Sequence, residues 1–194
     1  MIIFIRGEAW VVKKFTSFIA ITFAILAFSF VDINALSFSG TKSVRTIEQN
    51  VSTQILWMPR YEVFDLVGFS VDGGTVTLVG KVRNVINKSD AENRVEDIAG
   101  VTRVVNDIAV LPLGSFDESI RQTLHRTLSN SGGLSRYLWT MNPPVRLIVD
   151  RGHVSLEGFV SNRGDYNTMN VLAKGVSGVF SVTNNLILDN DRAR

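Results

Sequence analysis

The feature that most constrains the fold of this chain is an internal repeat. Residues 69–82 (FSVDGGTVTLVGKV) recur as residues 147–160 (LIVDRGHVSLEGFV), at a constant offset of 78. The same offset carries residues 84–108 onto residues 162–186, where asparagine, glycine and valine recur in register. A duplication kept in register over this length predicts two copies of one small module, and each copy must bury its own core.

Each copy has the pattern of a hairpin, a helix and a strand. In the first copy, residues 66–71 and 75–82 alternate apolar and polar side chains around a turn that contains Gly73 and Gly74. Glycine supplies the positive φ that a tight hairpin needs. Ser89 and Glu92 have the spacing of a capping box, which predicts a helix start there, and Gly100 is placed to end that helix. Residues 101–111 are predicted to form the third strand.

An amphipathic helix is predicted ahead of each hairpin. A capping box at Thr46 to Gln49 opens the first helix, and one at Ser115 to Glu118 opens the second. The offset is only 73 between these helices, so the second copy has five extra residues within 129–144. The predicted fold is therefore α+β: two tandem αββαβ modules, each with a small three-stranded sheet and two helices packed on one face.

The predicted modules span residues 43–111 and 115–189. Only Pro112, Leu113 and Gly114 lie between them. Three residues reach about 10 Å when fully extended. We therefore expect the modules to pack against each other or to hold a preferred angle.

Residues 1–35 have the pattern of a secretory signal peptide. Lys13 and Lys14 precede an uncharged apolar run over residues 15–31, and Ala35 follows as a small residue at a cleavage site. The alternative is an uncleaved anchor in the inner membrane, although this run is short for a membrane span. Both interpretations place the modules outside the cytoplasm, and we expect a periplasmic protein.

Composition and charge exclude several classes of function. The chain has no cysteine, which rules out disulfides, thiolate metal sites and cysteine nucleophiles. From Leu36 onward there are 17 Lys and Arg against 16 Asp and Glu, which is not the concentrated positive charge of a nucleic-acid-binding protein. The two histidines lie on separate predicted elements, so no metal or other cofactor is predicted.

The residues of the repeat resemble the BON domain. The resemblance rests on Val-x-Leu-x-Gly-x-Val in the second strand and on Gly-Val-x-x-Val-x-Asn before the third. The residues are Val76, Leu78, Gly80, Val82, Gly100, Val101, Val104 and Asn106, with Val154, Leu156, Gly158, Val160, Gly178, Val179, Val182 and Asn184 in the second copy.

This resemblance implies a non-enzymatic exported protein that contacts phospholipid or the membrane surface and maintains the envelope under osmotic stress. Lipoprotein members carry a cysteine after the signal, and this chain does not. The family has no catalytic motif to transfer. His153 lies near Asp150 and Ser155 in sequence, but a triad would also need an oxyanion hole and a nucleophile elbow, and neither is visible. No catalytic residue is predicted.

The predicted binding residues are aromatic, apolar and basic side chains near the insertion. Such a mixture is typical of a bilayer interface. The alternatives are that these side chains close the cores or recruit another envelope protein. The candidates are Arg136, Tyr137, Trp139, Met141 and Arg146 in the second copy and Trp57 in the first. Gly80 and Gly158 could mark the close approach of a ligand, but they are interpreted as structural, because glycine within a strand more often marks a bulge or a tight helix crossing.

Overall fold

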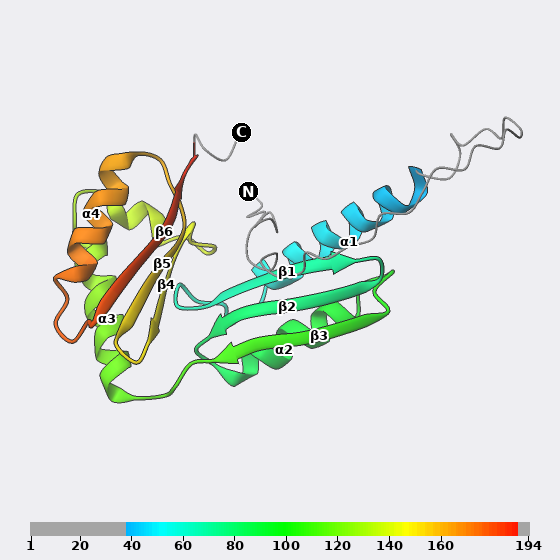
Figure 1. Ribbon diagram of the computed structural model, residues 1–194, viewed down its shortest axis with the longest axis horizontal. Helices are drawn as coiled ribbons and strands as arrows, with labels where there is room; N and C mark the ends of the chain where they lie inside the picture. Colours follow the sequence, from blue (N-terminus) through cyan, green and yellow to red (C-terminus); the bar gives the residue numbers. More distant parts are fainter. Residues whose placement is uncertain (1–37, 190–194) are drawn as a thin grey trace, which may run out of the picture.

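The computed structural model describes the backbone of residues 38–189 and the side chains of residues 46–189, so the predicted signal segment lies outside the described residues. Two αββαβ modules follow each other along the chain (Figure 1), as predicted. The first contains α1 (Phe38–Leu56), β1 (Leu66–Asp72), β2 (Thr75–Val82), α2 (Val85–Glu96) and β3 (Arg103–Val110). The second contains α3 (Ser115–Ser129), the 3-10 helix η1 (Leu134–Tyr137), β4 (Val145–Asp150), β5 (His153–Val160), α4 (Arg163–Lys174) and β6 (Ser181–Leu188).

Both sheets have the same topology and register. The middle strand pairs antiparallel with the first strand of its module and parallel with the third. Leu78 pairs with Phe69 and Asn106, and Leu156, which is 78 residues later, pairs with Leu147 and Asn184. The repeat in the sequence is therefore a repeat in the structure.

Each module has its own core between the sheet and the two helices. In the first module, Val76, Leu78 and Val82 of β2 point toward α1 and α2 and are fully buried. In the second, Val154, Leu156 and Val160 of β5 do the same against α3 and α4. Since alternate strand residues face one side, the alternation in the sequence sets which face is covered.

The predicted start of the second helix of the first module was wrong. α2 begins at Val85, one turn before the capping-box pattern at Ser89, because Asn84 caps it: its side chain accepts a hydrogen bond from Ile86 N (2.9 Å). Asn162 caps α4 in the same way through Asp165 N (2.9 Å). Asparagine is among the best N-cap residues, and its recurrence at the 78-residue offset was the available signal.

The first helices of the two modules also differ from the capping-box prediction. α1 begins at Phe38, eight residues before Thr46. α3 begins at Ser115 as predicted, but no side chain caps it. The carboxylate of Asp117 instead accepts hydrogen bonds from Arg151 N and Gly152 N (both 2.8 Å). Asp117 therefore ties α3 to the β4–β5 turn.

The recurring asparagines of the third strands join sheet and helix. The Nδ2 atom of Asn106 donates to Lys88 O (3.0 Å), and that of Asn184 donates to Tyr166 O (3.2 Å). Lys88 and Tyr166 are themselves related by the 78-residue offset. This residue of the motif has a structural role in both modules.

Gly80 and Gly158 have the structural role expected of them. Their φ angles are +128° and +109°, and a Cβ at either position would collide with a backbone oxygen, that of Leu66 or Pro144. Only glycine combines this backbone conformation with so close an approach.

We predict that Gly158→Ala lowers the free energy of unfolding by at least about 2 kcal/mol, because it adds both backbone strain and a collision. Urea denaturation followed by circular dichroism measures the change. Gly175→Ala is the matched control: Gly175 ends α4 with a negative φ, and its added Cβ would lie 3.5 Å from the nearest atom considered. Equal stabilities of the two variants would contradict the prediction.

Candidate functional site

The insertion of the second module has two parts with different surroundings. Leu134, Tyr137 and Leu138 are buried and belong to the core of that module. Trp139 and Met141 are 72% and 78% exposed. The first part closes the core, and the second presents two large apolar side chains to solvent.

Hydrogen bonds hold the first part of the insertion on the start of α4. The hydroxyl of Tyr137 donates to Asp165 Oδ2 (2.6 Å) and accepts from Ser161 N (3.0 Å). Arg136 forms an ion pair with the same carboxylate, donates to Gly133 O (2.9 Å) and lies over the Tyr137 ring (4.6 Å to the centroid). Tyr137 is thus a core residue, and the charge of Arg136 is already paired.

The exposed indole of Trp139 is anchored. Its Nε1 donates to Ser129 Oγ at the end of α3 (2.8 Å). The polar atom of the ring is therefore satisfied within the protein, while the apolar surface stays open. This is a suitable geometry for contact with an apolar environment.

The first module exposes apolar side chains at its corresponding end. Trp57, just after α1, is 63% exposed, while the neighbouring Met58 is buried. Asn87 of α2 donates to Arg60 O (2.8 Å), which brings the loop after α1 against the start of α2. Val85 and Ile86, the first residues of α2, are also exposed.

Arg146 does not lie on the predicted surface. It is 2% exposed, its Nη1 donates to Glu62 O (2.8 Å), and its guanidinium lies over the ring of Tyr61 (4.3 Å). Burial lowers the pKa of Arg146 and raises that of Tyr61. The structure gives Arg146 contacts with the first module, and its charged atoms are not accessible to a head group.

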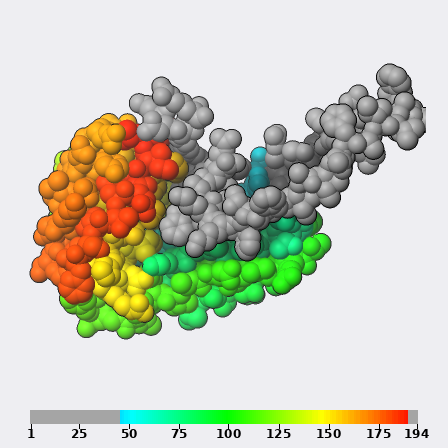
Figure 2. Space-filling model, viewed as in Figure 1, coloured from blue at the N-terminus to red at the C-terminus, as the bar shows by residue number. Residues whose placement is uncertain are grey.

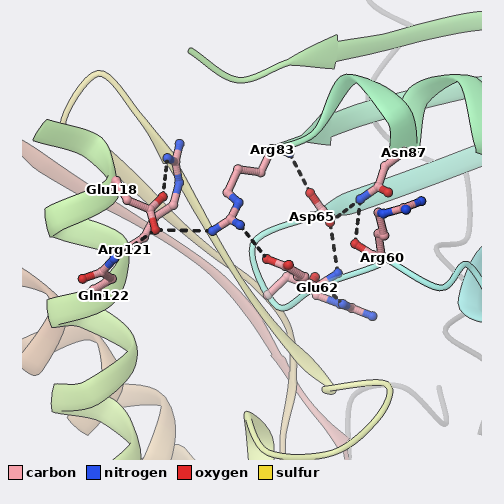
Figure 3. Close-up of polar contacts among 9 residues, drawn as sticks. Arg60, Glu62, Asp65, Arg83, Asn87, Glu118, Arg121 and Gln122 are labelled. Carbon is pink, nitrogen blue, oxygen red and sulfur yellow. Dashed lines mark hydrogen bonds and ion pairs between the residues drawn. The ribbon is translucent and has the colours of Figure 1, made fainter. Parts of the chain in front are cut away.

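Arg146 belongs to a polar junction between the modules, most of which Figure 3 shows. Arg83 pairs with Glu62 of its own module and with Glu118 of α3, both at 3.4 Å. Asp65 is buried and accepts from Arg83 N (2.6 Å), Glu62 N (3.0 Å) and Asn87 Nδ2 (2.8 Å). These contacts fix the loop that carries residues 61–65.

That loop completes the second module. Val63 is buried in the core of the second module, and Phe64 packs against the same core. Val63 O accepts from Leu147 N (2.8 Å), which covers part of the free edge of β4. Figure 2 shows the two modules in contact. The expected packing between the modules is therefore present, and residues of the first module form part of the second core.

A sequence model of the BON domain matches residues 43–112 and 116–190, once for each module. The chain belongs to the BON domain family. BON domains are non-catalytic and are associated with membranes or with interactions among envelope proteins.

Two solved structures show distant similarity to this tandem BON protein. One is CdsD, a structural protein of the type III secretion system of Chlamydia trachomatis: it is 17% identical, the match covers 76% of this chain and 95% of that chain, and the TM-score is 0.27. The other is the C-terminal domain of CdsD, with 16% identity, 72% and 96% coverage and a TM-score of 0.26. No curated protein matches the chain.

The described part of this BON protein contains no group of three or more His, Cys, Asp or Glu side chains placed to hold a metal ion. None of its helices is both long and apolar enough to cross a membrane. His153 Nδ1 contacts Ser181 Oγ (2.7 Å), and Asp150 pairs with Lys81 (2.7 Å). Its hydrogen bond with Lys81 lowers the pKa of Asp150.

We predict that Val63→Ala destabilises the second BON module, although Val63 belongs to the first. Removing two buried methyl groups costs roughly 1–3 kcal/mol, and the amide hydrogen of Leu147 should exchange faster. Urea denaturation and hydrogen exchange measure these effects. Val79→Ala makes the same change at an exposed position of β2, and should shift stability by less than about 0.5 kcal/mol. Unchanged exchange at Leu147 would contradict the role assigned to this loop.

Proposed function

We propose that this BON protein is exported to the periplasm and binds phospholipid surfaces through the exposed apolar side chains of its two equivalent ends. Trp57 lies on the first module, and Trp139 and Met141 lie on the second. The observation that carries the proposal is the exposure of all three, at 63%, 72% and 78%. Large apolar side chains gathered on a surface mark sites of contact with membranes or proteins.

The geometry of Trp139 favours insertion into the head-group region. An indole is normally amphipathic, and burying its N–H without a partner opposes its transfer from water. The bond from Trp139 Nε1 to Ser129 Oγ removes that cost and restricts the motion of the ring. Contact of about 60 Å² of indole surface contributes about 1.5 kcal/mol at 25 cal/mol per Å².

The charges around these ends support only modest attraction to anionic lipid. Arg146 is buried, and Arg136 is paired with Asp165. Arg60 and Arg163 are exposed beside the two ends. Apolar contact is therefore the main source of affinity in this proposal, and salt should weaken binding less than it would at a polybasic surface.

The biological role that we propose is maintenance of the envelope under osmotic stress. Two features support it: the chain belongs to the BON family, and residues 1–35 have the pattern of a secretory signal. If the signal stays uncleaved, it would anchor the protein in the inner membrane and keep both modules near lipid.

The experiment that tests binding is flotation of the chain from Leu36 onward with phospholipid vesicles, neutral or anionic, at low and moderate salt. We predict that Trp57→Ala combined with Trp139→Ala weakens binding at least tenfold, since tenfold corresponds to only about 1.4 kcal/mol. Val171→Ala is the control, because Val171 is also largely exposed but lies on α4.

Two results would contradict the proposal. Flotation of the double variant like that of the unchanged chain would remove the two tryptophans from the site. Absence of flotation with every vesicle and salt concentration would reject lipid binding and favour the second function that the family suggests, interaction with another envelope protein.

A further inference from the structure

The two modules differ most informatively at the turn between β4 and β5. The apolar, glycine and asparagine positions of the motif recur in both copies, but at this turn the second module replaces small side chains with large or charged ones. Gly73, Thr75 and Thr102 of the first module correspond to Arg151, His153 and Phe180 of the second. Changes grouped in space within one duplicated fold point to a site that the second module alone possesses.

Arg151 occupies a backbone conformation that suits glycine. Its φ is +52°, and it is the one residue other than glycine with a positive φ among those described. Gly73, its counterpart, has a φ of +58°. A side chain is disfavoured at this φ, and such positions are found where the residue has a function. The carboxylate of Asp117 holds this backbone by binding Arg151 N and Gly152 N.

An aromatic surface lies next to Arg151. The rings of Phe116 and Phe180 are 5.7 Å apart and are 49% and 70% exposed. The ring of His153 meets Phe180 edge-on at 6.1 Å. Phe180 lies against Gly152, where a Cβ would come within 2.6 Å of its ring. The turn therefore accommodates exposed rings that the core does not need.

A hollow of about 310 Å³ lies on the outer face of the second sheet, next to Lys81 of the first module, and one of its lining residues, His153, contacts Phe180. It is lined by Lys81, Ile148, Asp150, Arg151, His153 and Ser155. Lys81 and Asp150 neutralise each other at 2.7 Å. Among residues 46–189, no carboxylate lies within ion-pair distance of Arg151. The hollow thus combines an imidazole, a hydroxyl and a guanidinium that forms no salt bridge among the described residues, and His153 connects it to the ring of Phe180.

We propose that this face binds an acidic segment of a protein partner. A carboxylate of the partner would lie between Arg151 and His153, and a neighbouring apolar side chain would lie on Phe116 and Phe180. Charge complementarity selects the acidic group, because a guanidinium binds carboxylate in a bidentate way. Exposed aromatic rings beside arginine are typical of the residues that contribute most to protein interfaces.

Two observations favour a peptide over a membrane at this face. The hollow is concave, so a protruding side chain of a peptide can enter it, whereas the surface of a bilayer cannot. β4 also separates this face from the insertion: Trp139 lies before the start of the strand, and Arg151 follows its end. Six strand residues span about 20 Å. The site can therefore be occupied independently of the lipid contact proposed above.

The test uses the chain from Leu36 onward, which contains both cores and their junction. The probe is the blocked peptide acetyl-Asp-Phe-Glu-Leu-amide, and its comparison is the neutral acetyl-Asn-Phe-Gln-Leu-amide. We predict that the acidic peptide shifts the amide NMR signals of Arg151, Gly152 and His153, and that the neutral one binds at least tenfold more weakly. Binding should also weaken as salt is added.

Arg151→Gly separates function from folding. It restores the residue of the first module, so Tm should rise by about 2–4 °C while affinity for the acidic peptide falls at least tenfold. Arg103→Ser removes an exposed arginine of β3 and should leave affinity unchanged.

Absence of signal changes with the acidic peptide, or unchanged affinity in Arg151→Gly, would overturn the proposal. So would displacement of the same amide signals by anionic vesicles and not by the peptide, because the face would then be a lipid contact. None of the peptide measurements requires lipid, so their outcome is independent of the flotation experiment.

Discussion

The contact between Val63 and the second module is the interaction on which the arrangement of this protein depends. The carbonyl of Val63 accepts a hydrogen bond from Leu147 N at the edge of β4, and its side chain fills part of the second core. An uncovered edge strand would expose unpaired backbone groups and invite association with other chains. One loop therefore stabilises a core, covers an edge and fixes the angle between the modules. The surroundings of Arg146, Arg83 and Lys81 follow from that placement, because each of these residues contacts the neighbouring module.

The sequence predicted the fold well because the fold depends on local patterns that occur twice. Alternation in β2 and β5, the turn glycines and the recurring asparagines each have a local physical cause, and the 78-residue offset tests every assignment against a second copy. The surroundings of individual side chains at the insertion were harder to predict. Tyr137 and Trp139 lie two residues apart and have similar character, yet one is in the core and the other is exposed. The environment of Arg146 depends on a loop more than eighty residues away in sequence, and no local pattern indicates that contact.

The two modules solve one structural problem with different residues. The backbone N–H of the residue after the second strand needs a hydrogen-bond acceptor. In the first module Arg83 N donates to the carboxylate of Asp65, and in the second Ser161 N donates to the hydroxyl of Tyr137. The helix residue that supports this acceptor changes to match. Asn87 donates to Asp65, whereas its counterpart Asp165 accepts from Tyr137. The helix residue is thus a donor in the first module and an acceptor in the second, and the backbone N–H after the second strand has a partner in both. Divergence between the copies is therefore not by itself a sign of function, and it acquires that meaning only where the new side chains, like Arg151 and Phe180, are not needed to satisfy the fold.

The same comparison explains why the contact between modules need not continue from one chain to the next. A head-to-tail contact joins two different surfaces, and contacts of this kind can link one chain to the next into an open filament. The polar contacts at this junction cannot be repeated, because their counterparts at the 78-residue offset do not match. Lys81 and Asp150 correspond to Phe159 and Asp72, and Arg146 corresponds to Gly68, so neither the ion pair nor the cation over a ring can recur. Each partner of the junction thus exists once, in the module where it is used. This asymmetry favours pairing within the chain over pairing between chains, and it leaves Trp139 and Met141 exposed for another contact.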